Sequence, residues 1–454
     1  MKFDNSPPEP TIALLHWGDL IEDFLDTIGV SFEAFCNEMT GGWMFGYIEA
    51  LRRAGVRTVL FCISGSVTEP VYYTHKETGA KICTLPAPQL YQAVRRQMVN
   101  PQGWTVQDMF GEVRGLRRLM LAGVKSVTPY LATPLGLLAG EMRRENCQAI
   151  LCQEYEYPRF DACTWLGWRM GLPVFATFQG GDFQVSPWEG LSRPIALKAS
   201  AGLIIASQTE VQRVQSRYGV HPAKIARIFN PLDLELWQPM DRAEARQLLG
   251  FPSDAEIVAC HGRIEIRRKG LDILLEAWER ICRDRPGRDL RLLLVGTGSD
   301  AEELSQRIAQ MQLSGIVWVN EYVRDRALMR QYLSAADVYT LPSRHEGFPV
   351  APLEAMACGL PVVAADAPGV PDIFEGGEAD GGIVVPREDA TALAGGIGRV
   401  LDDRAWGRDL GKRARIRVET HFSLEAIGVQ LRQFLGDRSL AHNSADLTRS
   451  TGNA

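Results

Sequence analysis

Residues 342–366 read PSRHEGFPVAPLEAMACGLPVVAAD, and this stretch decides the fold of the second half of the chain. Apolar residues 338–341 precede it and indicate a strand. A helix is expected to begin near Val350 and to stop where Gly359 takes the left-handed position, with a proline close behind. Residues 362–365 return to a short apolar run. The order strand, loop, helix, strand predicts one unit of a parallel sheet.

The loop between that strand and helix contains two carboxylates and a glycine. Glu346 lies ahead of the helix and Glu354 about one turn into it, at the strand end where open parallel sheets bind ligands. Gly347 lets the backbone approach a ligand, because it has no side chain. The first amides of the helix form an anion site. The alternative is a solvated loop in which Glu346 stabilises the helix dipole, and the complete string favours the ligand site.

Short apolar runs alternate with helical patterns through most of the chain. The runs are continuous, which is typical of parallel strands covered on both faces, so we expect an α/β protein. The expected strands are residues 11–17, 57–63, 149–153, 174–178, 202–206 and 225–229 in the first half, and 257–260, 291–295, 316–319, 338–341, 361–365 and 382–385 in the second.

Two prolines at residues 230–241 interrupt the alternation and mark a linker. The sequence therefore predicts an N-terminal domain at 1–235 and a C-terminal domain at 236–421. A last helix is expected at 422–435, where it can pack back on the first domain. The polar residues 436–454 are expected to be disordered.

The bulk composition excludes several classes of protein. The chain has 454 residues, 46% of them hydrophobic, and a net charge of −6, which argues against nucleic acid as a general partner. Its nine cysteines contain no C-x-x-C pair, which argues against disulfides or structural zinc and indicates a reducing compartment. Because the sequence lacks a signal-peptide pattern and a run of about 20 apolar residues, we expect a cytoplasmic protein without a membrane span.

The segment from Glu346 to Glu354 resembles the E-x7-E signature of the family-4 retaining glycosyltransferases, also described as glycosyl transferases group 1. The similarity covers residues 202–435 well and the first 200 residues loosely. It implies the GT-B fold, in which two Rossmann-like parallel-sheet domains face each other across a cleft. It also implies a nucleotide-diphosphate sugar as donor, bound by the C-terminal domain, with no metal and no other cofactor.

The resemblance also assigns roles within the motif. It implies that Glu354 holds the ribose hydroxyls of the donor and that Glu346 faces the transferred sugar. The backbone around Glu346 would contact that sugar and the diphosphate. The residues concerned are Gly347, Phe348, Pro349 and Val350.

A cationic segment lies upstream. A strand at 257–260 leads into HGR at 261–263, and RRKG at 267–270 opens a helix. The negative charge that develops on a diphosphate leaving group must be neutralised, and the chain has no Asp-x-Asp motif to hold Mg²⁺. The resembled family uses an Arg and a Lys at this spacing, which match Arg263 and Lys269. The alternative is surface cations, which would oppose the helix dipole.

Two further donor-site candidates come from the resemblance. Residues 294–300 read LVGTGSD, but the third glycine of a dinucleotide fingerprint is absent, which disfavours a dehydrogenase. In the resembled family this turn lies beside the nucleotide, so Gly296 is a candidate, and a purely structural turn explains it equally well. Val323 is the candidate for contact with the base.

The first half contains a glycine pair before a helix, in the TGGW of residues 40–43. Glycines at this place let amides reach a phosphate or a sugar. The resemblance implies that Gly41 and Gly42 lie over the donor diphosphate, and the alternative is a simple N-cap turn at Thr40.

The acceptor candidates lie in residues 176–182, which read ATFQGGD. Many members of the resembled family have His where this chain has Gln179. Glutamine can bond a sugar hydroxyl but cannot titrate, so a His-assisted step is in doubt. Asp182 is a second acceptor candidate, with capping of the next turn as the alternative.

Residues 91–125 contain six cations, two acids and intervening apolar residues. A basic amphipathic segment of this kind can rest on an anionic membrane. The alternative is a core-packing helix with a solvated face.

These observations predict a retaining, metal-independent hexosyltransferase. It would transfer a sugar from a UDP- or GDP-linked donor to a saccharide or lipid-linked acceptor, in polysaccharide or glycolipid biosynthesis, with peripheral contact at the inner membrane face left open. Two alternatives remain: a nucleotide-sugar epimerase with the same fold, and an inactive nucleotide-sugar-binding protein.

Overall fold

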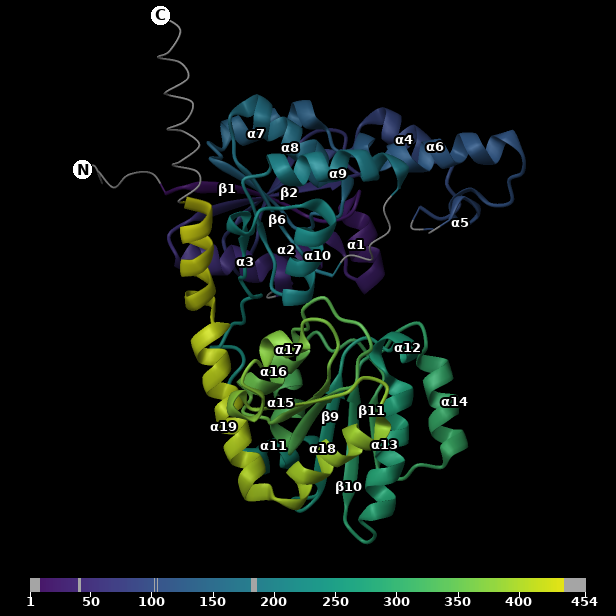
Figure 1. Ribbon diagram of the computed structural model, residues 1–454, viewed down its shortest axis with the longest axis vertical. Helices are drawn as coiled ribbons and strands as arrows, with labels where there is room; N and C mark the ends of the chain where they lie inside the picture. Colours follow the sequence, from purple (N-terminus) through teal and green to yellow (C-terminus); the bar gives the residue numbers. More distant parts are fainter. Residues whose placement is uncertain (1–8, 40–41, 102, 104, 181–185, 437–454) are drawn as a thin grey trace, which may run out of the picture. The chain divides into compact units, whose positions relative to one another are not determined.

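Buried apolar strands build two separate sheets, as the continuous apolar runs predict. The computed structural model describes residues 9–39, 42–101, 103, 105–180 and 186–436 (Figure 1). Most of the expected polar tail, residues 437–454, lies outside this part. The chain divides into two units. Unit 1 consists of Met1–Ile205, Glu210–Ile228 and Ile427–Ala454, and unit 2 consists of Ala206–Thr209 and Phe229–Ala426.

Unit 1 contains an eight-stranded sheet in the order β3-β4-β2-β1-β5-β6-β7-β8. Its strands are β1 (Thr11–Leu15), β2 (Arg57–Ser64), β3 (Val71–Thr74), β4 (Lys81–Pro86), β5 (Ala149–Cys152), β6 (Val174–Thr177), β7 (Gly202–Ile204) and β8 (Ile225–Ala226). The run from β4 to β7 follows the Rossmann order, because the chain winds outward in both directions from β1. All six strands expected in this half are present and pair in parallel.

The β3–β4 hairpin departs from the parallel pattern and was not expected. Strand β3 pairs antiparallel with β4 at the edge of the sheet. Its residues, Val71–Thr74, are half-buried or exposed, so they lack the continuous apolar run that marks the other strands. The turn closes with the amide of His75 donating to the carbonyl of Ala80 at 2.8 Å.

Helices cover both faces of this sheet. They are α1 (Ile21–Ile28), α2 (Phe32–Asn37), α3 (Gly42–Arg53), α4 (Gln89–Arg95), α5 (Val106–Phe110), α6 (Leu116–Leu131), α7 (Leu135–Arg144), α8 (Pro158–Met170), α9 (Pro187–Ala199) and α10 (Gln208–Tyr218). Figure 1 shows α7, α8 and α9 on one side of the sheet and α2, α3 and α10 on the other.

The last described helix, residues 424–436, packs on unit 1 from its middle onward. Its Phe434 ring meets the ring of Phe175 edge-on, with centroids 5.7 Å apart. Arg432 donates to the carbonyl of Ala54 at 2.7 Å. Residues 427–436 therefore return to the sheet that the first half of the chain forms.

Unit 2 contains a six-stranded parallel sheet in the order β11-β10-β9-β12-β13-β14, which is again the Rossmann order. Its strands are β9 (Glu256–His261), β10 (Leu290–Val295), β11 (Ile316–Val319), β12 (Val338–Leu341), β13 (Val362–Ala365) and β14 (Gly382–Val385). Its helices are α11 (Arg242–Leu249), α12 (Ile266–Lys269), α13 (Leu271–Asp284), α14 (Ala301–Met311), α15 (Arg326–Ala335), α16 (Ala351–Ala357), α17 (Val370–Ile373), α18 (Ala390–Asp402) and α19 (Arg404–His421).

All six strands expected in the second half are present, so the predicted α/β class with two parallel sheets is confirmed. The helix after Val350 is also confirmed: α16 begins at the next residue, and Gly359 has φ +78°. The nine cysteines are free thiols, and all but Cys282 are buried. They pack as small apolar residues.

Candidate active site

The candidate site lies where the strand order of unit 2 reverses. Strands β9 and β12 are neighbours in the sheet, but the chain leaves their carboxyl ends toward opposite edges. In open parallel sheets, ligands bind at this switch point, because the two departing loops leave a crevice between them. The loops here are residues 262–270 and 342–350.

These two loops are docked against each other. The amide of Arg344 donates to the carbonyl of Arg268 at 2.9 Å. Gly270 has φ +64°, and a side chain there would collide with the carbonyl oxygen of Pro342. A glycine is therefore required at 270 both by the backbone conformation and by the close approach.

A bidentate ion pair holds the same junction. Both terminal nitrogens of Arg344 donate to the carboxylate of Asp272, at 2.7 and 2.8 Å. Burial works to raise the pKa of Asp272, but the hydrogen bonds from Arg344 outweigh it and hold that pKa below its usual range. The first turn of α13 is thus fixed to the loop after β12.

Lys269 and Glu346 form an ion pair across the two loops. The lysine Nζ lies 2.7 Å from Oε1 of Glu346. Glu346 is 7% exposed, whereas the Lys269 side chain is 25% exposed. A buried carboxylate needs a cationic partner, so Glu346 holds the ammonium group at the edge of the site, with one side of it open to solvent.

His261 and Glu354 form the second pair. The imidazole Nε2 lies 2.8 Å from Oε2 of Glu354. Since a carboxylate only accepts, Nε2 is the donor, and Nδ1 is buried without a hydrogen-bond partner among the described residues. The ring of Tyr339 lies edge-on to the imidazole, with centroids 5.4 Å apart. His261, the last residue of strand β9, therefore orients Glu354 through Nε2. The Nδ1 that lacks a partner among the described residues belongs to the same imidazole ring.

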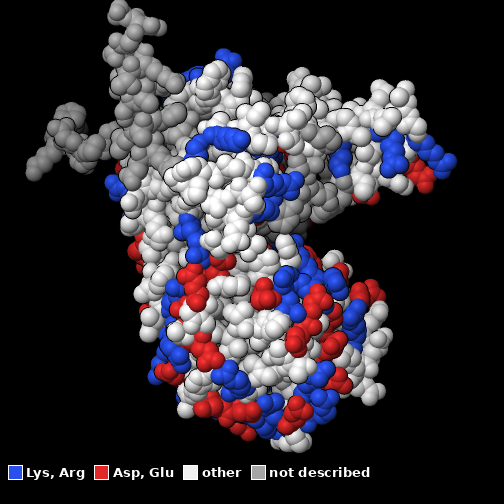
Figure 2. Space-filling model, in the orientation of Figure 1, with Lys and Arg blue, Asp and Glu red and all other residues white. Residues whose placement is uncertain are grey.

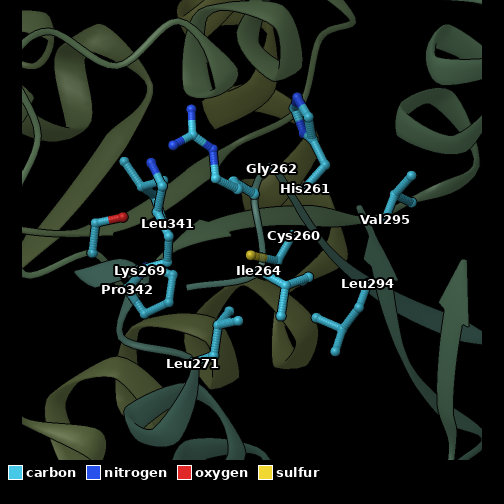
Figure 3. A pocket seen from close by; sticks show the side chains of 12 residues that line it. Cys260, His261, Gly262, Ile264, Lys269, Leu271, Leu294, Val295, Leu341 and Pro342 are labelled. Carbon is cyan, nitrogen blue, oxygen red and sulfur yellow. The ribbon is translucent and has the colours of Figure 1, made fainter. Parts of the chain in front are cut away.

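A pocket opens between the carboxyl ends of β9, β10 and β12 (Figure 3). His261 and Lys269 extend to one side of it, and Leu271 and Leu294 lie opposite. Its lining also includes Gly262, Arg263, Ile264 and Ser343. The structure thus brings both predicted cations, Arg263 and Lys269, to one pocket at the switch point.

Two side chains complete the chemistry of this pocket. The Arg263 side chain is 53% exposed and pairs with Glu265 at 2.9 Å, so it is free to exchange that partner for an anion. The buried Ser343 Oγ has no hydrogen-bond partner in the described part of the chain. Cations and unsatisfied polar atoms in one pocket suit an anionic, hydroxyl-rich ligand.

The pocket also contains a thiol, Cys260. Burial raises its pKa to about 12, so it stays protonated near neutral pH. A protonated thiol is a weak nucleophile. The pocket therefore works through charge and hydrogen bonding rather than through Cys260.

Comparison with known proteins shows which family the region around the pocket resembles. Residues 255–403, which include this pocket, match the family described as Glycosyl transferases group 1. This part of the chain is similar to the group 1 glycosyltransferases. It is 28% identical over 314 residues to a GDP-mannose-dependent monoacylated alpha-(1-6)-phosphatidylinositol monomannoside mannosyltransferase of Corynebacterium glutamicum, with 67% of this chain and 74% of that protein covered.

Another relative matches over a shorter region. The chain is 34% identical over 205 residues to the D-inositol 3-phosphate glycosyltransferase of Saccharomonospora viridis, with 44% of this chain and 47% of that protein covered. The alignment thus spans about half the length of that relative.

Solved structures show the same fold. The sucrose-phosphate synthase of Thermosynechococcus elongatus superimposes with a TM-score of 0.68 at 24% identity, covering 95% of this chain and 100% of that one. Anabaena HepE in complex with UDP superimposes with a TM-score of 0.65 at 16% identity, covering 94% and 100%. The chain therefore has the GT-B fold that its sequence predicts.

The glycine turn after β10 has a packing reason of its own. Gly296 has φ +140°, and a side chain there would collide with the carbonyl oxygen of Gly262. The turn after β10 thus lies directly against the turn after β9. Val323 is half-buried in the loop that follows β11. Contact of Gly296 or Val323 with the donor stays a prediction.

The motif residues around Glu346 divide into buried and accessible ones. The Phe348 ring is buried and stacks on Phe229, with centroids 5.2 Å apart, and Pro349 is also buried. Gly347 and Val350 are half-buried. Only the backbone of Phe348 can therefore serve the predicted donor contact, since its side chain packs inside unit 2.

The unit 1 candidates are only partly described. Gly41 and Asp182 lie outside the described residues, and Gly42 is the first residue of α3. Gln179 follows β6, donates its amide to Oε2 of Glu154 at 2.9 Å, and donates its side-chain nitrogen to Oγ1 of Thr177 at 3.2 Å.

Two further polar residues lie at strand ends, and sequence reasoning missed the first of them as a site residue. His261 ends β9 beside the predicted cations, and its signal was a polar residue closing a buried apolar run. Glu154 follows β5 at the switch point of unit 1 and is only 4% exposed. Burial raises the pKa of Glu154 to about 8.

Among the described residues, no three His, Cys, Asp or Glu side chains gather in an arrangement that could hold a metal ion. None of the helices described is both long enough and apolar enough to cross a bilayer.

Proposed function

We propose that this glycosyltransferase transfers a hexose, with retention of configuration and without a metal ion, from a nucleoside-diphosphate sugar to a saccharide or lipid-linked acceptor. The observation that carries the proposal is the placement of Lys269 and Arg263 in one pocket at the switch point of unit 2. Breaking the bond between the sugar and the diphosphate leaves negative charge on the phosphate, and fixed cations can neutralise it without Mg²⁺.

Each paired carboxylate has a separate role. Glu354, oriented by His261, accepts hydrogen bonds from the ribose hydroxyls of the donor. Glu346 faces the transferred sugar and stabilises the positive charge that develops at its anomeric carbon. The pair with Lys269 occupies one oxygen of Glu346 and weakens it as a nucleophile, which favours attack on the front face over a covalent intermediate.

In the front-face reaction all atoms are accounted for. The bond from the anomeric carbon to the β-phosphate oxygen breaks, and the acceptor oxygen bonds to the same face of that carbon. The acceptor proton passes to the departing phosphate oxygen, and Lys269 and Arg263 stabilise the nucleoside diphosphate that leaves. This route needs no titrating side chain in unit 1, which is compatible with Gln179.

The relatives guide the choice of donor and acceptor. One is named for GDP-mannose and a phosphatidylinositol mannoside, and one fold neighbour was solved with UDP. We therefore propose GDP- or UDP-linked hexoses as donors, polysaccharide or glycolipid biosynthesis as the setting, and a cytoplasmic protein in peripheral contact with the inner membrane face.

A thermal-shift screen of GDP, UDP, GDP-mannose and UDP-glucose tests donor binding, because only ligands of the folded state raise the melting temperature. NMR of the product then reports the anomeric configuration, with the α-configuration of the donor retained as the expected result. A free epimer without transfer would identify an epimerase instead. Donor binding without turnover of any acceptor would identify an inactive binding protein.

Metal dependence is tested in the same assay. Turnover in EDTA should equal turnover in added Mg²⁺, because Lys269 and Arg263 supply the positive charge. Loss of activity in EDTA that Mg²⁺ restores would contradict this part of the proposal.

A further inference from the structure

Three neighbouring helices of unit 1, α6, α8 and α9, expose large apolar side chains to solvent. They contact one another on one side of the sheet (Figure 1). Trp168 on α8 is 78% exposed, Leu119 on α6 is 71% exposed, and Ile195 on α9 is 71% exposed. Burying side chains of this size is strongly favourable, so a cluster of them in water points to an interaction surface.

The exposed apolar residues follow helical spacing. Trp165 and Trp168 are three residues apart on α8, and Leu191 and Ile195 are four apart on α9. Residues at these spacings lie on one face of a helix. Leu166 and Leu197 point into the core of unit 1. Helices α8 and α9 therefore have one apolar face toward the core and a second one toward solvent, unlike an ordinary surface helix.

The acids of α8 and α9 point inward. The carboxylate of Asp161 accepts hydrogen bonds from Arg193 at 2.6 Å and from Tyr130 and Ser192 at 2.7 Å. Tyr130 belongs to α6 and the other two to α9, so Asp161 joins all three helices. Glu189 is also buried, and it caps the start of α9 through the amide of residue 186. The three helices form a connected platform whose negative charge is internal.

The exposed charges on these helices are all positive. Arg117 and Arg118 on α6, Arg169 on α8 and Lys198 on α9 are exposed, and α6 contains no acid. Arg169 lies over the ring of Trp165, 5.2 Å from its centroid. Figure 2 shows Lys and Arg with few Asp or Glu over this part of unit 1. This is the reverse of the chain's net charge of −6.

We propose that α6, α8 and α9 form a docking surface for an anionic lipid bilayer. Tryptophan and leucine side chains enter the headgroup region, and the adjacent cations attract anionic phosphates. A second copy of the chain fits less well, because two of these surfaces would bring like charges together. This surface specifies the membrane contact of the proposed function. Only its purpose, which is to hold unit 1 where a lipid-linked acceptor lies, rests on that function.

Co-sedimentation with vesicles, in the absence of donor, tests the surface independently of transfer. Vesicles of phosphatidylglycerol and phosphatidylcholine in equal parts should bind the full chain at least about tenfold more strongly than pure phosphatidylcholine, and added salt should weaken that binding. The triple variant Leu119→Ser, Trp168→Ser and Ile195→Ser should lower binding at least about tenfold.

A second variant tests the charges. Arg117→Gln, Arg118→Gln and Arg169→Gln together should reduce binding to anionic vesicles at least about tenfold and leave the weak binding to neutral vesicles unchanged. The matched control is Tyr322→Ser with Ile416→Ser, which removes side chains of similar exposure from unit 2 and should bind as the wild type does.

A single substitution, Trp168→Phe, tests the same surface without altering several residues at once. Brominated lipids should quench tryptophan fluorescence less in Trp168→Phe than in the wild type, because Trp168 enters the bilayer. Equal quenching, equal vesicle binding by all variants, or no binding to anionic vesicles would overturn the proposal. So would a concentration-dependent dimer that the triple variant abolishes, since the surface would then serve a second copy of the chain.

Discussion

Replacing Lys269 with methionine removes the ammonium group and keeps most of the apolar stem, so it isolates the effect of the charge. The ammonium lies 2.7 Å from a carboxylate oxygen of Glu346, which is only 7% exposed. Without the cation, that carboxylate stays buried and lacks its charged partner. The expected cost is about 1–3 kcal/mol in the free energy of unfolding.

The effect on turnover follows from the charge of the leaving group. At about 4 Å and an effective dielectric constant of about 20, an ammonium group and one new unit of negative charge interact by about 4 kcal/mol. Removing a single preorganised partner of this kind costs about 2.7–4 kcal/mol in other enzymes. At about 1.4 kcal/mol per factor of ten, Lys269→Met should lower kcat by about 100- to 1000-fold.

A second substitution separates stability from catalysis. Glu346→Gln in the Lys269→Met background removes the uncompensated charge, so the free energy of unfolding should return to within about 1 kcal/mol of the wild type. Turnover should stay low, because neither the cation nor the carboxylate is restored. Urea unfolding measures the first quantity, and release of UDP or GDP from UDP-glucose or GDP-mannose, with the acceptor that supports transfer, measures the second.

Two results would refute this reasoning. Lys269→Met could lose stability and keep turnover within about threefold of the wild type. Lys269 would then stabilise the fold by pairing with Glu346 and would have no role in turnover. Alternatively, turnover could recover together with stability in the double variant. Either result would remove Lys269 from the phosphate site.

The remaining predictions concern other parts of the site and the fold. Glu354→Ala and His261→Ala should each weaken binding of UDP or GDP about tenfold by calorimetry, because His261 orients the ribose partner, and unchanged affinity would exclude both. The free energy of unfolding should fall as pH rises from about 4.5 to about 8, because the buried Glu154 carboxyl, with its pKa raised to about 8, is protonated in the folded state and its stabilising contribution is lost through that range. Glu154→Gln mimics the protonated form and should flatten this slope, which is at most about 1.4 kcal/mol per pH unit, whereas an unaltered slope would contradict the assignment. Gly296→Ala should cost about 2 kcal/mol or more in urea unfolding, because its φ is +140° and the new side chain would collide with Gly262; full stability would show that the turn can shift.

The strands of both sheets could be predicted because a strand buried on both faces has a continuous run of apolar residues in the sequence. Strands β1, β5 and β12 are buried at every residue, so each appears as a continuous apolar run. Strand β3 could not be found in this way, since its half-exposed residues depend on pairing with β4 at the edge of the sheet. Local patterns thus reveal buried strands and miss edge strands.

The sequence predicts the candidate site as single residues, but it does not predict the contacts between them. Lys269 and Glu346 are 77 residues apart, and their ion pair depends on how Gly270 approaches Pro342. Glu354 contacts His261, which lies 93 residues earlier in the chain. This contact depends on the pairing of strands β9 and β12 in the sheet. Such pairs arise from tertiary packing, which motif spacing does not contain.

The exposed apolar surface of unit 1 was only partly visible in the sequence. The basic and apolar residues up to Lys125 indicated a membrane-facing segment or a core-packing helix. The tryptophans of α8 and α9 gave no such signal, because the sequence does not tell which of two apolar faces a helix turns to the core. Their exposure became evident only in the folded unit.

A crystal structure of the protein with UDP or GDP bound tests the central claim most directly. The account predicts diphosphate oxygens about 3 Å from the Lys269 ammonium and the Arg263 guanidinium, with ribose hydroxyls on the carboxylate of Glu354. A nucleotide bound away from all three residues would contradict it, whatever its affinity.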